Sequence, residues 1–172
     1  MILLAADEAR FGRISDTRRC WAPHPIRPIA PRQVIQEYSY VYAAVSPVLG
    51  RMTTLILPYV NTEMMNRFIG QVAIDFSQYF VILLVDQAGW HLSGGLSFPD
   101  NVRFIYQPAY SPELNPAEHL WEELREKELA NKAFDSLDTL EDALCEGLNQ
   151  LASHPQRLRS LTDFPYFKVT PI

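Results

Sequence analysis

Three carboxylates stand at positions where a folded chain could use them for chemistry. Asp7 ends the apolar run ILLAAD, Asp86 ends the run YFVILLVD, and Glu118 lies within YSPELNPAEHLW. A strand-ending acid can simply mark the start of a loop. Holding an acid at the end of a buried strand is costly, however, unless it meets a partner or a metal. Because open α/β sheets place their sites just beyond strand ends, Asp7 and Asp86 could converge.

Glu118 has two competing roles in the helix expected to begin near it. Asn115 suits the N-cap and Pro116 the first helical position, so that Asn-x-x-Glu resembles a capping box, which usually has Ser or Thr at the cap. The apolar stripe of this helix consists of Ala117, Leu120, Trp121 and Leu124. At about 100° per residue, Glu118 lies on the flank of that stripe, where it would line a groove beside the core. One carboxylate cannot both cap its helix and bind a metal well.

The three acids together predict a particular kind of metal chemistry. Three oxygen donors without Cys or His fit Mg²⁺ or Mn²⁺. Two such ions about 4 Å apart can activate a water or a 3′-hydroxyl and stabilise the leaving oxygen of a phosphodiester. Acids crowded together repel each other, so raised pKa values or bound metal must offset that repulsion. Residue types alone leave open whether the three converge.

The elements that must position these acids follow from hydrophobic periodicity. Strands are predicted at residues 2–7, 38–47, 51–58, 79–86 and 102–108, and helices at residues 61–76, 115–131 and 136–152. The second and third strands read as a hairpin, and Asn61 or Thr62 can cap the first helix. Residues 22–32 carry four prolines and are expected to be extended or looped. An antiparallel hairpin followed by β-α-β alternation predicts a mixed sheet with helices on both faces.

The composition indicates one folded domain in a reducing compartment. The chain has 172 residues, of which 48% are hydrophobic and 20% charged. No apolar run reaches the roughly 18 residues of a membrane span. The N-terminus MILLAADEAR does not resemble a secretory signal. Cys20 and Cys145 lie far apart with no CxxC, which argues against a disulfide framework or zinc site and favours a cytoplasmic protein.

The charge distribution is uneven along the chain. The net charge is −5, which argues mildly against a simple polyanion binder. Residues 1–60, however, hold seven Arg against four acids, for a balance of +3, and the remainder has −8. Most of this positive charge lies between Arg10 and Arg32. The segment is either a solvated loop or an arm that contacts phosphates.

Two blocks of sequence resemble a known family. VDQAGWH followed by YQPAYSPELNPAEHLW resembles the catalytic core of mariner-superfamily DDE transposases, in particular the bacterial insertion-sequence branch. LLAADEARFGR resembles the first block of that family, and CWAPHPIRP its Trp-containing loop. The matches extend from about residue 3 to about residue 125, and residues 106–121 are the most specific part.

The resemblance implies a fold, a reaction and a set of metal ligands. The fold would be RNase H-like, a mixed five-stranded sheet with helices on both faces. Asp7, Asp86 and Glu118 would be the catalytic residues and would hold two Mg²⁺ or Mn²⁺ ions. The chain would be a DDE transposase, an endonuclease-type enzyme that hydrolyses phosphodiesters and transfers strands in DNA transposition.

The chain departs from the family pattern at four points. Gln87 replaces the usual Asn, Ala109 the second Pro, and His119 the basic Arg that commonly follows the glutamate. Only 31 residues lie between Asp86 and Glu118, a few fewer than is common. We interpret the difference as a shorter loop near GGLSFPDN.

Several neighbouring residues are candidates for a site edge or for DNA contact. His91 is either structural or orients a carboxylate or touches DNA, and Trp90 could stack on a base. Trp121 is expected in the core. Glu8 faces away from Asp7 on a strand, which favours a structural or salt-bridging role over ligation. The candidate DNA-contacting cations are Arg10, Arg13, Arg18 and Arg19.

The resemblance also implies partners. DNA is expected at transposon ends and at the target. Family members carry helix-turn-helix segments before this core, whereas Met1 falls almost at the first strand, so we expect that region to be absent from this single domain of residues 1–172. The chain would be a second reading frame joined to an upstream one, or a truncated remnant. Its partners would then be an upstream DNA-binding region, a full-length transposase, or a second copy in a homodimer.

Two alternatives to a working transposase stay open. One is a non-catalytic remnant that binds and interferes with full-length transposase. The other is an RNase H-like repair or recombination nuclease, which the Asn-Pro-x-Glu block disfavours. In the absence of an end-recognition region, we expect the chain alone to bind DNA weakly, without sequence preference and with strong salt dependence.

Overall fold

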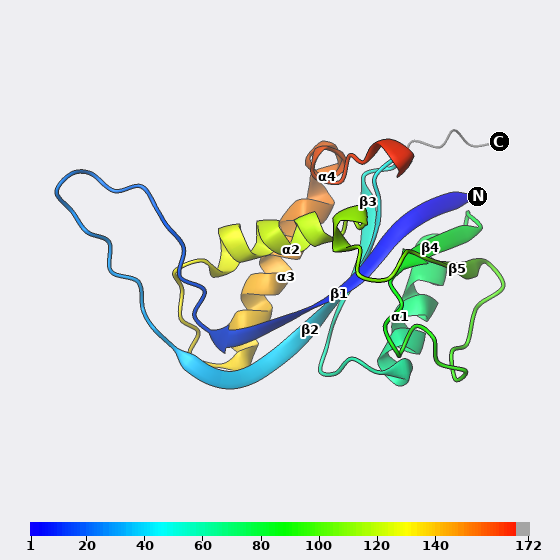
Figure 1. The fold of residues 1–172 in the computed structure, drawn as a ribbon, viewed down its shortest axis with the longest axis horizontal. Helices are drawn as coiled ribbons and strands as arrows, with labels where there is room; N and C mark the ends of the chain where they lie inside the picture. Colours follow the sequence, from blue (N-terminus) through cyan, green and yellow to red (C-terminus); the bar gives the residue numbers. More distant parts are fainter. Residues whose placement is uncertain (168–172) are drawn as a thin grey trace.

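A five-stranded mixed sheet forms the centre of the protein (Figure 1). The structure is a computed structural model that describes residues 1–167. Its elements are β1 (Ile2–Ile14), β2 (Val34–Ser46), β3 (Arg51–Leu57), α1 (Thr62–Asp75), β4 (Val81–Val85), β5 (Val102–Tyr106), η1 (Pro112–Leu114), α2 (Glu118–Leu124), η2 (Arg125–Leu129), α3 (Leu137–Ser153), α4 (Pro155–Leu161) and η3 (Pro165–Phe167). The strand order is β3-β2-β1-β4-β5.

The sheet combines both kinds of strand pairing. β2 pairs antiparallel with β1 and with β3, whereas β4 runs parallel to β1 and to β5. The hairpin and the β-α-β alternation predicted from the sequence are therefore confirmed. This order places the carboxyl end of β4 beside the middle of β1, which is where Asp86 and Asp7 occur.

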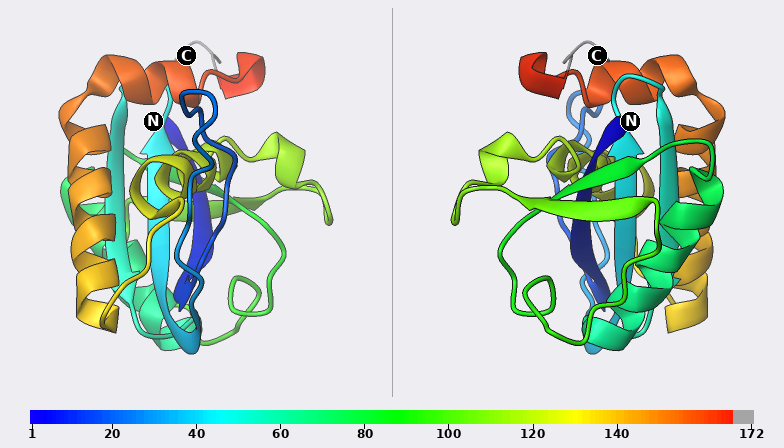
Figure 2. Two further views of the ribbon diagram at one scale, coloured as in Figure 1. Left: turned by 90° about the vertical axis from the view of Figure 1, so that its left-hand side faces the viewer. Right: turned by 90° about the vertical axis from the view of Figure 1, so that its right-hand side faces the viewer.

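Helices cover both faces of the sheet, as Figure 2 shows. On one face, Leu4 and Tyr42 pack with Phe68 of α1 in a cluster closed to solvent. On the other face, Ala5 and Val41 belong to a cluster with residues of α2, α3 and α4. Consecutive residues of β1 are thus buried on opposite sides, which explains why its start reads as a continuous apolar run. The predicted helices on both faces are confirmed.

β1 is longer than its sequence predicts. Its pairing with β4 ends at Ala5, but its pairing with β2 continues to Ile14. Beyond the ends of β3 and β4, residues 11–14 in the far half of β1 pair with residues 34–39 of β2 as a two-stranded ribbon (Figure 1). Asp7 consequently lies in the middle of β1 and not at its end. Residues 15–33 project from the end of the ribbon without helix or strand, as the prolines predict.

The helices follow the predicted pattern except at α2. Asn61 caps α1, since its Oδ1 accepts a hydrogen bond 2.9 Å long from the backbone N–H of Met64. The second predicted helix, at residues 115–131, is shorter: α2 begins at Glu118, and a π-helical turn, η2, replaces it after Leu124. Among residues 1–167, no helix has the length and apolar character needed to cross a membrane.

Candidate active site

The three candidate carboxylates line one cavity of about 450 Å³. Asp7 comes from β1, Asp86 directly follows β4, and Glu118 opens α2. The remaining lining residues are Gln87, Ala88, Gln107, Ala109, Tyr110, Ser111, Pro112 and Asn115. Within residues 1–167, however, no group of three or more His, Cys, Asp or Glu side chains is placed so that it could hold a metal ion. The acids share a cavity without forming a closed coordination shell.

Asp7 is held by a tryptophan from the facing helix. The indole Nε1 of Trp121 donates a hydrogen bond 2.8 Å long to Oδ2 of Asp7. Burial raises the pKa of Asp7 to about 7, and the charges of Glu118 and Glu8 act in the same direction, whereas the Trp121 bond lowers it. Trp121 is buried in the core, as predicted. Its bond to Asp7 has no signal in the sequence, since the two residues are 114 positions apart.

Asp86 is held by a buried histidine. Nδ1 of His91 donates to Oδ1 of Asp86 over 2.7 Å, and the backbone N–H of Ala88 donates to the same oxygen over 3.0 Å. The His91 bond lowers the pKa of Asp86, although burial opposes it. The structure thus places His91 where it can orient a carboxylate, one of the roles considered for it.

A second carboxylate holds the other side of His91. Nε2 of His91 lies 3.1 Å from Oε1 of Glu8, whose side chain is only 4% exposed. Burial lowers the pKa of His91, but the hydrogen bonds to Asp86 and Glu8 outweigh it and raise that pKa to about 9. Glu8 therefore has the salt-bridging role expected from its position opposite Asp7, and His91 is a cation between two anions.

Trp90 also binds Glu8. Its Nε1 donates over 3.1 Å to Oε2 of Glu8, and the ring is partly buried beside the core of the α1 face. The polar edge of the indole is therefore occupied within the protein. Stacking of Trp90 on a base stays a prediction.

Asn115 positions the start of α2 against β1. Its Nδ2 donates over 3.0 Å to the carbonyl of Ala6, and its Oδ1 accepts from the backbone N–H of Ala117 over 3.1 Å. The backbone N–H of Asn115 donates to the carbonyl of Pro112, so it does not require the Glu118 carboxylate. The capping-box alternative is therefore wrong, although Asn115 does bind the first turn. Its side chain fixes Glu118 relative to the residue next to Asp7.

Burial and neighbouring acids shift the pKa of Glu118. Burial raises the pKa of Glu118, and the charges of Glu122 and Asp86 act in the same direction, whereas Arg125 lowers it. Asp7 and Glu118 thus both hold their protons more tightly than usual. A bound cation would relieve the repulsion that contributes to these shifts.

Two lining residues were missed by the sequence analysis. Oε1 of Gln107 is buried without a hydrogen-bond partner in the described part of the chain, which is uncommon unless a ligand or water completes the site. Tyr110 is fully exposed and has a φ of 57°, a strained value for a residue with a large side chain. Both lie in the YQPAYSP stretch between β5 and α2, where no pattern in the sequence distinguishes these two side chains from their neighbours.

The four candidate arginines differ in how much the protein occupies them. Arg10 and Arg13 lie in β1 and not in a loop. Arg13 donates to the carboxylate of Glu37 and to the carbonyls of Phe134 and Asp135, so it anchors the ribbon to a neighbouring loop. Arg10 is exposed, and its guanidinium lies 4.5 Å from the centre of the Tyr38 ring.

The other two arginines lie in the projecting segment. Arg18 pairs with Asp16 at 3.1 Å and with Glu126 at 3.6 Å, whereas Arg19 is exposed. DNA contact by any of the four stays a prediction. Arg10 and Arg19 are the two whose charge the surrounding protein neutralises least.

Comparison with known proteins places the chain in a family. Residues 3–141 match the family described as DDE superfamily endonuclease. An uncharacterized protein, y4pE/y4sA of Sinorhizobium fredii (strain NBRC 101917 / NGR234), is 35% identical over 126 residues, which cover 72% of this chain and 93% of that protein.

Solved structures of the Mos1 transposase share the fold. The paired-end complex with the left transposon end matches with a TM-score of 0.62 and 17% identity over 93% of this chain and 55% of that chain. The Mos1 mariner paired-end complex with Mn matches with a TM-score of 0.65 and 16% identity over 94% and 53%. The chain therefore spans about half the length of the solved transposase. The expected RNase H-like fold is confirmed. Since the family match covers most of the sequence, the chain belongs to the DDE superfamily of endonucleases, and its resemblance to mariner-type DDE transposases is confirmed.

Proposed function

We propose that the chain is the catalytic domain of a DNA transposase that hydrolyses and transfers phosphodiesters. The observation that carries the proposal is the shared cavity: Asp7, Asp86 and Glu118 reach it from three different elements. Membership of the DDE endonuclease superfamily supports the same chemistry. The solved Mos1 complexes contain transposon ends, which favours DNA as the substrate here.

The donor set fits divalent metal ions. The three carboxylates offer hard oxygen ligands, and the same cavity is lined by Gln107, whose buried Oε1 has no hydrogen-bond partner among residues 1–167. Within residues 1–167, the two hydrogen bonds to the Asp86 carboxylate both reach Oδ1, which leaves Oδ2 for a cation. Asp7, Asp86 and Glu118 would hold two Mg²⁺ or Mn²⁺ ions. When bound, such ions supply Lewis-acid activation and stabilise charge on the attacking and leaving oxygens.

The residues of the chain would orient the reacting groups. Trp121 and His91 each fix one carboxylate, so Asp7 and Asp86 present defined faces to the cavity. In the first reaction, a water oxygen bonds to phosphorus and the bond from phosphorus to the 3′-oxygen breaks, which frees a 3′-hydroxyl. In the second, that hydroxyl attacks a phosphodiester of the target DNA and displaces another 3′-oxygen. An upstream DNA-binding region and a homodimer stay predictions.

Replacement of Asp86 tests the assignment. Asp86→Asn keeps the side-chain size but removes the charge, and it should reduce Mn²⁺-dependent nicking of plasmid DNA at least about 100-fold, more than loss of an outer-shell residue does. Asp100→Asn is the matched control, because Asp100 is an exposed loop acid away from the cavity. Nicking that survives in Asp86→Asn contradicts the assignment. Absence of nicking by the unmodified chain would instead favour the non-catalytic remnant.

A further inference from the structure

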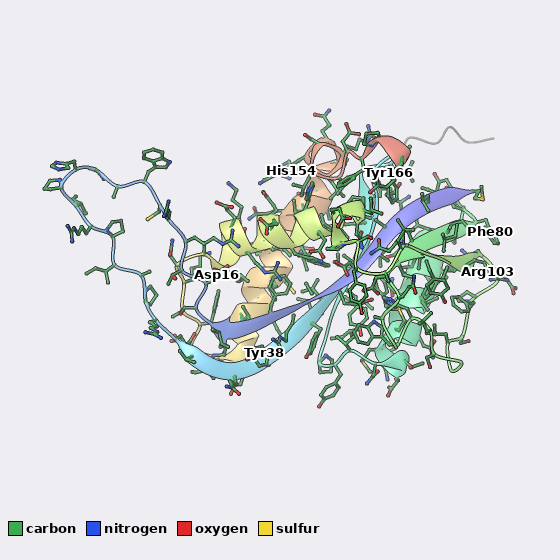
Figure 3. The ribbon with its side chains drawn as sticks, viewed as in Figure 1. Asp16, Tyr38, Phe80, Arg103, His154 and Tyr166 are labelled. Atoms are coloured by element: carbon green, nitrogen blue, oxygen red, sulfur yellow. The ribbon has the colours of Figure 1, made fainter. Side chains whose placement is uncertain are left out.

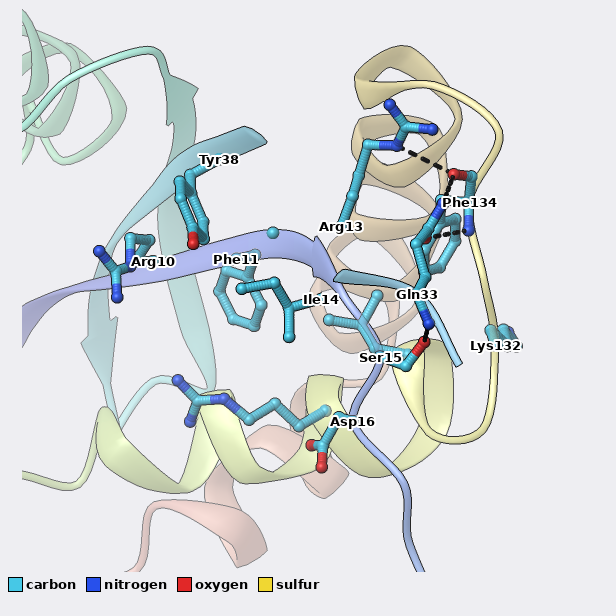
Figure 4. Close-up of a pocket in the computed structure, with 13 residues that line it drawn as sticks. Arg10, Phe11, Arg13, Ile14, Ser15, Asp16, Gln33, Tyr38, Lys132 and Phe134 are labelled. Atoms are coloured by element: carbon cyan, nitrogen blue, oxygen red, sulfur yellow. Dashed lines mark hydrogen bonds between the residues drawn. The ribbon is translucent and has the colours of Figure 1, made fainter. Parts of the chain in front are cut away.

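A second cavity, of about 320 Å³, lies between the far half of β1 and the end of α2 (Figure 4). Its charged lining consists of Arg10, Arg13, Arg125, Lys132 and Asp16. The lining thus has four cations and one carboxylate, so its charge is positive, whereas the net charge of the whole chain is −5. In Figure 4, Arg10 and Tyr38 lie at one end of this cavity and Ser15 and Asp16 at the other.

Two of the cations are held by aromatic rings and not by acids. The guanidinium of Arg10 lies 4.5 Å from the centre of the Tyr38 ring, and that of Arg125 lies 5.3 Å from the centre of the Phe11 ring. Within residues 1–167, neither guanidinium makes a hydrogen bond or an ion pair. Stacking orders a guanidinium while leaving its N–H edge free for a bidentate anion such as phosphate.

The Tyr38 platform depends on a glycine. A Cβ atom at Gly12 would come within 2.3 Å of Cδ1 of Tyr38, so the ring can lie against the strand only because residue 12 has no side chain. The strand register pairs Gly12 with Tyr38 directly. Arg10, two residues earlier on the same side of β1, then stacks on this ring. The strand register and the lack of a side chain at Gly12 thus determine where the Arg10 guanidinium lies.

The cationic cavity and the carboxylate cavity are lined by successive residues of the same two parts of the chain, β1 and the helical segment that begins with α2. Arg10 follows Asp7 by three strand residues, which is about 10 Å along β1 and puts its side chain on the other face of the strand. Arg125 follows Glu118 by seven helical residues, which is also about 10 Å. β1 and α2 run in the same direction in Figure 1, and Phe11 of β1 packs on Trp121 of α2 with ring centres 6.0 Å apart. Since a DNA strand advances about 3.4 Å per nucleotide along the duplex axis, about 10 Å corresponds to roughly three nucleotides.

We propose that the cationic cavity binds a phosphate of the DNA strand about three nucleotides from the bond held at the carboxylates, with Arg10 and Arg125 as its contacts. The identification of the bound strand as DNA rests on the proposed function. The end of the β1–β4 pairing at Ala5 frees the side of β1 along which this strand would lie. Arg13 also lines the cavity, but its guanidinium already donates to Glu37 and to two backbone carbonyls. Its role is therefore structural.

The salt dependence of DNA binding tests the two contacts. Binding of the full chain to a labelled duplex is measured by fluorescence anisotropy in EDTA between about 50 and 200 mM salt. Arg10→Gln and Arg125→Gln should each lower the slope of log K against log salt by about one, as expected when one phosphate contact is lost. Arg10→Lys and Arg125→Lys should keep the slope, because they keep the charge.

Arg103→Gln is the matched control. Arg103 also stacks on an aromatic ring, Phe80, at 5.9 Å, but it lies at the opposite end of the molecule from Tyr38 and Asp16 (Figure 3). Its slope should equal that of the unmodified chain. Unchanged slopes in the Arg10 and Arg125 variants, or an equal drop in Arg103→Gln, would overturn the proposal. Saturation with inorganic phosphate that leaves the DNA slope unchanged would assign the cavity to a free anion and also overturn it.

A second measurement needs no variant and so is independent of folding. Duplex DNA with randomly ethylated phosphates is nicked with Mn²⁺, and the nicked strands are sequenced. Ethylation about three nucleotides from the nick should be depleted, and uniform ethylation on both sides would overturn the proposal. If the chain nicks nothing but the slopes fall as expected, the phosphate contact stands and the catalytic proposal fails. If the chain nicks DNA but the slopes are unchanged, the catalytic proposal stands and the phosphate contact fails.

Discussion

Asp7 and Asp86 follow similar apolar runs and line the same cavity, yet their surroundings shift their pKa values in opposite directions. Burial, together with two neighbouring acids, raises the pKa of Asp7 to about 7, although the hydrogen bond from the neutral indole N–H opposes this rise. Asp86 is more exposed and contacts the His91 cation, so its pKa falls. The comparison shows that a charged donor outweighs partial burial, whereas a neutral donor does not outweigh deeper burial.

The largest expected effect comes from removing the cation on the Asp86 side. His91→Ala leaves the buried carboxylate of Glu8 without its positive partner, which should destabilise the protein by about 3–5 kcal/mol. Urea unfolding in EDTA measures the change. His154→Ala, at an exposed histidine that ends α3, should stay within about 0.5 kcal/mol. A loss below about 1 kcal/mol in His91→Ala would mean that the Glu8–His91–Asp86 chain is not an ion network.

Metal addition should stabilise the protein through the three proposed ligands, of which Asp7 is one. Mn²⁺ at 100 times its dissociation constant stabilises a folded protein by about 2.7 kcal/mol. We expect a rise in melting temperature of the unmodified chain and of Asp100→Asn, but none in Asp7→Asn. Scanning calorimetry with and without EDTA measures it. An equal rise in Asp7→Asn would place the ion elsewhere.

In the absence of metal, replacing Asp7 and replacing Asp86 should change the free energy of unfolding in opposite directions, by less than the effects above. The folded-state pKa of Asp7, about 7, lies above the usual 3.8, so its contribution to stability is full below pH 4 and is lost as pH rises through 7. Asp7→Asn removes the ionisation, and at pH 8 it should stabilise the protein by about 2 kcal/mol, roughly half the full linkage value at 1.4 kcal/mol per unit. The gain should disappear at pH 4.

Asp86→Asn is the matched comparison for that experiment. It removes the partner of His91 and should destabilise the protein at pH 8, by less than about 1 kcal/mol because Asp86 is partly exposed. Urea unfolding in EDTA at pH 4 and pH 8 measures both variants. Changes of the same sign at pH 8 would remove the difference between the two acids.

The parts of the fold predicted from sequence are those that local patterns determine. The apolar run before Asp86 and the Asn61 cap each predicted an element of the right type at the right place. The far half of β1 was not predicted, because Arg10 and Arg13 interrupt the apolar run. Only its pairing with β2, twenty or more residues later, makes it a strand.

The candidate site divides in the same way. The three acids could be identified from their sequence blocks, but their supporting contacts could not. The bonds from Trp121 to Asp7 and from Asn115 to Ala6 join residues 114 and 109 positions apart, so they exist only once β1 and α2 have packed. The π-helical turn that presents Arg125 has no proline or glycine to signal it.

The side-chain amide of Asn115 bears on how the proposed activity could be lost. It joins the β1 backbone beside Asp7 to the first turn of α2, where Glu118 lies, whereas Asp86 is joined to β1 through His91 and Glu8. A substitution at residue 115 would remove this connection between β1 and α2, although all three acids would still be present in the sequence. For the proposed transposase activity, the three acids together with Asn115 are therefore a stronger indicator than the three acids alone.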